Sequence, residues 1–210
     1  MDKSVYSVMM SDGLVALLDR EAYRQGVSRS VMLDRILANY FSVETDEMRA
    51  GSIFGIMERF IGGYDGLKFV NQASGYMAAV QSALAYKYNP TVKYSVELFP
   101  AGDLGQLKIS LRSRSEALLA AMEEFYGFFM KLEKKYIGER TYGYDGIRFT
   151  RVFLRQKDAT GEQLGEAIAR YVSDFDRYLG KYFAGAGSKE ILEYIEAEYV
   201  GNMKEKEVIL

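Results

Sequence analysis

Few side chains in this sequence could do chemistry, because it contains neither histidine nor cysteine. The missing histidine removes the commonest general base and metal ligand, and the missing cysteine removes thiol chemistry and disulfides. There is no Gly-x-x-x-x-Gly-Lys-Ser/Thr phosphate loop, and no set of carboxylates has the spacing of an EF-hand. The acidic pairs that remain, Glu123 with Glu124 and Glu196 with Glu198, are typical of solvated helix faces. We therefore expect no catalytic residue, metal or cofactor, and the protein is not expected to be an enzyme.

The most informative local pattern lies in residues 3–41. Residues 4–10 suit a β-strand in which alternate side chains share a face. The spacing of apolar residues then predicts one helix over residues 13–25 and another over residues 28–40. Gly26 stands between them, where a left-handed C-terminal cap belongs. The predicted order is one strand, one helix, a tight turn and a second helix.

A single strand in so short a region is physically incomplete. Its backbone N–H and C=O groups need a second strand, and about forty residues bury too little apolar surface to form a core alone. Nothing else in residues 1–41 can supply that strand. We therefore expect it to pair antiparallel with the same strand of a second copy, about a two-fold axis.

This order of elements resembles the ribbon-helix-helix family of DNA-binding proteins. The most specific likeness is the turn Gly26-Val27-Ser28-Arg29-Ser30, because the family joins its two helices with a similar Gly-x-Ser-Arg-Ser segment. The resemblance implies a homodimer in which an intermolecular two-stranded antiparallel ribbon enters the major groove of double-stranded DNA. It also implies that the second helix holds a phosphate at its N-terminus and that the protein regulates transcription.

The resemblance also implies a role for individual residues, according to their place in the ribbon and the helices. The outward side of the strand would contact DNA bases, and the turn would contact phosphate. The inward side of the strand and the apolar stripe of the second helix would form the dimer core. These residues are, for base contacts, Lys3, Val5, Ser7 and Met9; for phosphate contacts, Ser28, Arg29 and Ser30; and for the dimer core, Tyr6, Val8, Met10, Leu33, Ile36 and Leu37.

Two further interpretations of this region are open, and its charge favours the first of them. Residues 1–50 contain six basic and eight acidic residues, whereas affinity for DNA usually depends on Lys and Arg. One alternative is therefore a dimerisation or protein-interaction module that does not bind DNA. Another is a DNA-binding protein of plasmid maintenance or of the antitoxin type, whose C-terminal domain contacts a protein partner.

Length and composition indicate a second domain. The chain has 210 residues with 49% hydrophobic content and a net charge of −2, and no apolar run approaches the length of a membrane span. We expect a cytoplasmic protein with a DNA-binding and dimerisation module over residues 1–45. An α+β domain over residues 50–203 would serve oligomerisation or ligand sensing. Overall the sequence predicts an α+β chain: an N-terminal ribbon-helix-helix module followed by a mostly helical domain with a small antiparallel sheet.

Patterning places several elements in the C-terminal domain. Residues 92–98 and 106–112 alternate apolar and polar side chains around a loop rich in Gly and Pro, which predicts an antiparallel hairpin. Residues 74–86 have helical spacing. Thr160 with Gln163 predicts a capping box at the start of a long helix. Many of the 17 Tyr and 12 Phe lie in this domain; they form either an ordinary core, or a pocket for a small apolar ligand or a large dimer face.

One seven-residue pattern occurs twice. Gly-Tyr-Asp-Gly-Leu-Lys-Phe at residues 63–69 returns as Gly-Tyr-Asp-Gly-Ile-Arg-Phe at residues 143–149. Asp-Gly suits a hairpin turn with positive φ, and the flanking aromatic residues suit strands. The repeat is either a duplicated module or two similar hairpins with the same turn chemistry.

Overall fold

The computed structural model describes residues 4–210, with residues 71–74 described in their backbone only. The chain forms two compact units, Met1–Arg49 and Ala50–Leu210. We describe each unit by itself and call them the N-terminal unit and the C-terminal unit.

The N-terminal unit contains a pair of helices, α1 (Asp12–Arg24) and α2 (Arg29–Tyr40). Gly26 ends the first helix with φ +65°, as a left-handed cap requires. The hydroxyl of Ser28 caps the second helix by accepting a hydrogen bond from the backbone N–H of Val31 at 3.3 Å. Both helices and the cap at Ser28 agree with the sequence. The buried core between them is small and consists of Leu18, Ala22 and Met32.

The predicted ribbon-helix-helix fold is wrong. Residues 4–11 form neither helix nor strand, and three helices, α1, α2 and α3 (Asp46–Ile61), precede the first strand of the described chain. The alternation of residues 4–10 suits a strand, but a strand also needs a neighbour that accepts and donates its backbone hydrogen bonds. Within residues 4–210 no strand pairs with this segment. The α+β class holds, with a different order of elements.

The C-terminal unit is built on a six-stranded sheet in which all neighbouring strands are antiparallel. The strand order is β1-β2-β3-β4-β6-β5. The sheet is therefore larger than the small sheet expected from the sequence. The strands are β1 (Lys68–Ser74), β2 (Met77–Ala83), β3 (Thr91–Leu98), β4 (Gly105–Leu111), β5 (Tyr142–Tyr144) and β6 (Arg148–Phe153).

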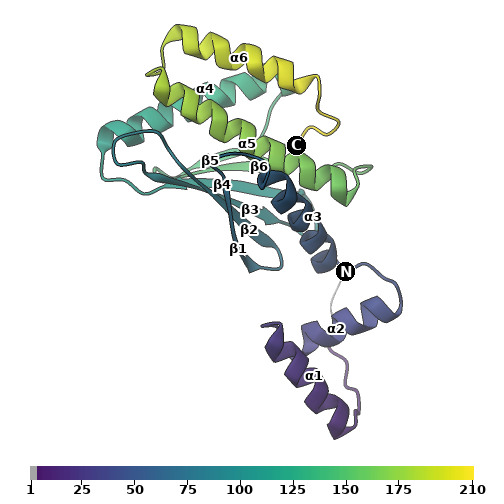
Figure 1. The fold of residues 1–210 in the computed structure, drawn as a ribbon. Coiled ribbons are helices and arrows are strands. Elements are labelled where there is room, and N and C mark those ends of the chain that lie inside the picture. Colours follow the sequence, from purple (N-terminus) through teal and green to yellow (C-terminus); the bar gives the residue numbers. More distant parts are fainter. Residues whose placement is uncertain (1–3) are drawn as a thin grey trace. The chain divides into compact units, whose positions relative to one another are not determined.

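Helices cover one face of this sheet (Figure 1). They are α4 (Glu116–Ile137), α5 (Gly161–Ala184) and, on the outer side of these two, α6 (Lys189–Met203). The inward strand residues and the helices share one core in which aromatic rings interlock. The ring centroid of Phe175 on α5, for example, lies 4.7 Å from the ring centroid of Phe129 and 5.4 Å from that of Phe125, both on α4. Rings that fill the interior in this way favour an ordinary core.

Two local predictions for this unit are confirmed and one is wrong. The predicted hairpin is β3 and β4, and the capping box of Thr160 and Gln163 starts α5 with both of its hydrogen bonds. The predicted helix over residues 74–86 is instead strand β2. Its Ala-rich sequence favours a helix, but pairing with β3 along the whole strand outweighs that local preference.

Candidate functional site

The residues predicted to contact DNA bases lie in an exposed N-terminal segment. Val5 and Met9 are almost entirely exposed, and Ser7 between them is exposed too. Lys3 lies outside the described residues. The segment has no helix or strand at residues 4–10, so no ribbon turns these side chains toward a DNA groove.

The residues predicted to contact phosphate are close together at the start of α2, but two of them already have partners. The hydroxyl of Ser28 is the helix cap. Arg29 donates two hydrogen bonds to the carboxylate of Asp19 on α1, from Nε and Nη2, each at 2.6 Å. These bonds lower the pKa of Asp19 below its ordinary value. Ser30 is exposed and stands beside Arg29. The guanidinium of Arg29 is thus held by an acid of its own unit.

The residues predicted to form a dimer core leave much apolar surface exposed. Of this predicted set, Leu33 packs against the small core, and the others are exposed. Further exposed apolar side chains come from the same segment and the same two helices. We call the exposed set the apolar N-terminal surface: Val5, Tyr6, Val8, Met9, Met10, Leu14, Leu17, Ile36, Leu37, Tyr40 and Phe41.

A second surface, not predicted from the sequence, lies on the sheet of the C-terminal unit. Alternate strand residues are buried against the helices, and the residues between them point to the other face. That other face carries five cationic side chains, Lys68, Lys93, Lys108, Arg112 and Arg148, which we call the basic sheet face. Strands β2, β3, β4 and β6, with Arg112 just after β4, line an open hollow of about 800 Å³ on it.

Register brings three of these cations into one row across the sheet. Lys68 on β1 pairs with Gln81 on β2, which pairs with Lys93 on β3. Lys93 pairs with Ser110 on β4, which in turn pairs with Arg148 on β6. Since directly paired residues of antiparallel strands share a face, the row runs across five strands on the open side of the sheet.

The acidic groups near the basic sheet face are few. Glu97 accepts a hydrogen bond from Lys108 Nζ at 2.7 Å and one from Gln106 at 2.8 Å, and these bonds lower its pKa. Arg148 follows the β5–β6 turn. In that turn the carboxylate of Asp145 accepts hydrogen bonds from the backbone N–H groups of Ile147 and Arg148. In the part of the chain that the structure describes, the side chains of Lys68, Lys93, Arg112 and Arg148 form no ion pair.

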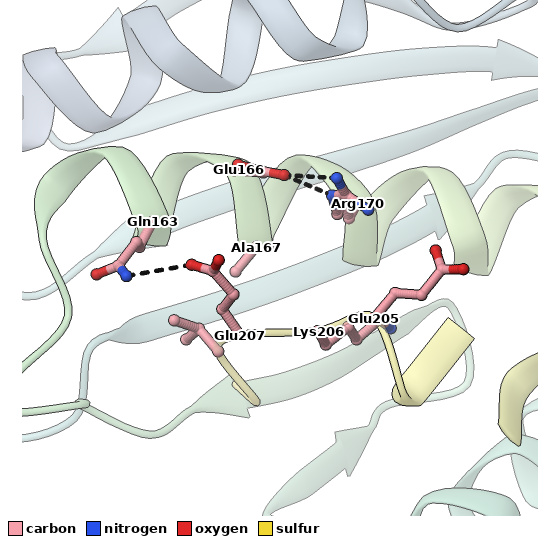
Figure 2. Close-up of a pocket in the computed structure, with 8 residues that line it drawn as sticks. Gln163, Glu166, Ala167, Arg170, Glu205, Lys206 and Glu207 are labelled. Atoms are coloured by element: carbon pink, nitrogen blue, oxygen red, sulfur yellow. Dashed lines mark hydrogen bonds and ion pairs between the residues drawn. The ribbon is translucent and has the colours of Figure 1, made fainter. Parts of the chain in front are cut away.

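A smaller hollow lies between α5 and the segment after α6 (Figure 2). Its volume is about 120 Å³. Gln163 donates to Glu207 at 3.2 Å, and Arg170 donates to Glu166 at 2.7 Å. Lys206 forms an ion pair with a carboxylate of α5 at 3.0 Å. Most charged groups of this hollow already have partners, so few are left to bind a ligand. The hollow lies where residues 204–210 pack against the rest of the unit.

Fold and site define an α+β protein with an apolar helical N-terminal unit and a sheet whose open face is basic. Comparison with protein-family models, with curated proteins and with solved structures gave no match. No comparison therefore tests the predicted membership of the ribbon-helix-helix family, whose N-terminal fold this structure does not have. Among the described residues, no helix has the length and apolar character needed to span a membrane, and no group of three His, Cys, Asp or Glu could hold a metal ion.

The basic sheet face was not predicted, although the sequence contains part of its signal. The alternation of residues 92–98 and 106–112 shows that Lys93, Lys108 and Arg112 share the polar side of a hairpin. The repeated seven-residue pattern puts Lys68 and Arg148 at equivalent positions. The missing information was the strand order, which places the two repeats on either side of that hairpin.

Proposed function

We propose that this protein self-associates through its N-terminal unit and, in that assembled form, binds double-stranded DNA as a regulator of transcription. The single observation that carries the proposal is the apolar N-terminal surface. It belongs to a unit whose core cluster, among the described residues, consists of Leu18, Ala22 and Met32 alone.

Self-association is supported by the balance of buried and exposed apolar groups. A unit of this size buries too little of its surface to be stable by itself, and oligomerisation is a common remedy. Soluble monomers rarely expose so many large apolar side chains in one small region, and such surfaces mark interaction sites. On α2, Leu33, Ile36, Leu37 and Tyr40 follow one another at helical spacing, so one stripe runs along the helix. A second copy is the simplest partner, since homodimers with two-fold symmetry are the commonest assemblies.

The DNA part of the proposal is supported by the turn between the helices. Gly26 and the cap at Ser28 fix the direction in which α2 begins. The first backbone N–H groups of a helix have no intrahelical partner and favour a phosphate. A dimer would present two such helix starts on one assembly, each with Arg29 beside it.

Light scattering coupled to size-exclusion chromatography tests the assembly. We expect a dimer or larger oligomer for the wild type, and a monomer for Leu37→Glu, because a charge in the middle of the stripe opposes burial. Ile147→Glu, at an exposed apolar residue of the C-terminal unit, is the matched control and should leave the oligomer intact. A wild type that is monomeric at every concentration measured would overturn self-association.

An electrophoretic mobility assay with random-sequence duplexes tests the second half of the proposal. We expect retardation at low salt and release as salt increases, since contacts to phosphate displace counterions. No retardation at the lowest salt used would leave a protein-interaction module as the function of the N-terminal unit.

A further inference from the structure

The geometry points to a second nucleic-acid site: we propose that the basic sheet face of the C-terminal unit binds the phosphate backbone of double-stranded DNA. The proposal rests on the proposed function for the identity of the polymer. It assigns the main phosphate contacts to residues of the sheet, outside the N-terminal unit.

The arrangement of the cations carries the proposal. Lys68, Lys93 and Arg148 stand in one row, on β1, β3 and β6. Because neighbouring strands lie about 4.8 Å apart, successive cations of the row are about 10 Å apart and the whole row spans about 19 Å. Cations spread along a line suit an extended polyanion, whereas a single phosphate needs cations that converge on one point.

The repeated seven-residue pattern supplies both ends of this row. Lys68 and Arg148 hold the same place in the two repeats, two positions after the glycine of an Asp-Gly turn. In both copies the turn glycine has positive φ, +86° at Gly66 and +88° at Gly146. The strands that follow, β1 and β6, run in the same direction and start at the same end of the sheet. Each repeat therefore puts a cation on the same face and in the same row.

The balance of charge on this face differs from that of the whole chain. The protein carries a net charge of −2, yet the basic sheet face has five cations and the one acidic strand residue Glu97. Lys108 is already paired with Glu97 at 2.7 Å. Four cations thus remain for a ligand among the described residues. Each end of the row has one acid in the turn before it, Asp145 three positions before Arg148 and Asp65 three positions before Lys68. Clustered like charges of this kind raise the local concentration of a polyanion.

The side chains between the cations favour a duplex over a single strand. The hollow is lined by short polar residues such as Thr91, Ser95 and Ser110, and no aromatic side chain is among its lining residues. Proteins that hold single strands stack their bases on aromatic rings. A hollow without rings can contact the sugar–phosphate backbone, which a duplex presents on its outside. Serine and threonine hydroxyls are regular phosphate donors.

The charge density of a duplex matches the extent of the row. Double-stranded DNA carries one charge per about 1.7 Å of helix axis, so a length of about 19 Å carries roughly eleven phosphates. The phosphates over that length outnumber the four uncommitted cations, which are the three of the row and Arg112, so we expect one phosphate contact for each. Four contacts predict a slope of about −3.6 for the logarithm of the binding constant against the logarithm of salt concentration.

The test is a salt titration of full-length protein on a fluorescent random-sequence duplex, followed by anisotropy. The variant Lys93→Gln/Arg148→Gln should reduce the magnitude of the slope by about 1.8 and weaken binding at low salt by at least about tenfold. Lys93→Glu/Arg148→Glu should weaken it further. The matched control for this Glu variant is Lys134→Glu/Lys189→Glu, which makes the same change of charge on exposed side chains of α4 and α6. Lys134→Gln/Lys189→Gln is the control for the Gln variant, and both controls should bind nearly as the wild type does. Circular dichroism and light scattering verify that each variant keeps its fold and oligomer.

Each result decides between the two proposals. If the sheet variants bind duplex as tightly as their controls do while Arg29→Glu abolishes binding, the sheet face is not the site and the N-terminal turn is. If wild type binds no duplex at low salt, both DNA proposals fail. A monomeric wild type that loses duplex binding through Lys93→Gln/Arg148→Gln would overturn self-association alone. Tighter binding to single strands, or binding to phosphatidylserine vesicles without binding to duplex, would overturn the choice of ligand.

Discussion

Arg151 on β6 and Glu133 on α4 form an ion pair in which both side chains are completely buried. The guanidinium lies 3.1 Å from one carboxylate oxygen and 3.3 Å from the other. Tyr142 donates its hydroxyl proton to the same carboxylate at 2.6 Å, and Arg151 also donates to the carbonyl oxygen of Leu210 at 2.7 Å. The pair thus joins the sheet, a helix that covers it and the last residues of the C-terminal unit.

Removal of one partner of this pair should destabilise the protein strongly. Glu133→Leu leaves the guanidinium of Arg151 buried without a counter-charge, which we expect to cost about 3–5 kcal/mol in the free energy of unfolding. Glu133→Leu/Arg151→Met removes both charges and should recover a large part of that loss, because apolar side chains of similar volume can replace a buried pair. Urea denaturation of the two variants and the wild type measures both effects. Equal losses in the single and double variants would contradict this account.

Buried tyrosines should make the protein less stable at alkaline pH. Burial raises the pKa of Tyr94, and so does the neighbouring carboxylate of Asp176. Oδ1 of Asp176 accepts a hydrogen bond from the Tyr94 hydroxyl, with 2.6 Å between the two oxygen atoms. Between the unfolded pKa of about 10 and the higher folded value, the unfolded chain loses this proton and the folded protein keeps it. The contribution of Tyr94 to the free energy of unfolding is therefore present in full below about pH 10. It falls as pH rises, by up to about 1.4 kcal/mol per pH unit for such a group.

The variant Tyr94→Phe isolates that group. It has no proton to lose, so its unfolding free energy should fall less steeply above about pH 10 than that of the wild type. It should also be less stable at neutral pH by about 1–3 kcal/mol, because Asp176 loses one of its donors. Ser82, the other hydroxyl that donates to Asp176, remains in place. Parallel curves of unfolding free energy against pH for the two proteins would show that Tyr94 does not cause the alkaline slope.

Short-range sequence patterns predict several elements of this fold correctly. The capping box of Thr160 and Gln163 needs three residues of context, and the β3–β4 hairpin needs a loop and two alternating strands, so each was visible in a short window. Residues 77–83 are a strand because β3 lies beside them, which their own alanine-rich sequence does not show. Residues 4–10 have the composition of a strand without a described neighbour to pair with.

The candidate site on the sheet depends on contacts that no short window contains. Ser110 and Arg148 are neighbours across β4 and β6, although the whole of α4 and β5 separates them in the sequence. Lys68 reaches the same row only because β1 pairs with β2, at the edge of the sheet that is remote from β5 and β6. Alternation predicted which side chains leave the core, but the set of strands that bring them together is a property of the folded topology.

The ion pair between Arg29 and Asp19 should regulate any binding of phosphate at the start of α2. Asp19→Asn removes the charge that holds the guanidinium, so we expect tighter binding to duplex DNA and a steeper dependence on salt. Arg29→Glu should weaken binding on every duplex sequence, since phosphate contacts carry no base information. Anisotropy on random duplexes measures both. Glu21→Gln, which removes an acid from the same helix that pairs with Arg24 instead, is the control for the change in net charge. If Asp19→Asn and Glu21→Gln improve binding equally, the effect is one of net charge and Arg29 has no special role.

Helices α3 and α5 cross closely at Gly165. A Cβ atom at Gly165 would lie 2.7 Å from the carbonyl oxygen of Ile53 and 2.8 Å from Cβ of Ile56. Gly165→Ala should therefore destabilise the protein by about 1–3 kcal/mol, because the two helices must move apart. Gly180, in the same helix, has no atom within 4 Å of its would-be Cβ. Gly180→Ala should stabilise the protein by about 0.5–1 kcal/mol, since alanine is the better helix former. Opposite shifts of the urea midpoint confirm the crossing, whereas equal gains in both variants would show that the helices are not in backbone contact at Gly165.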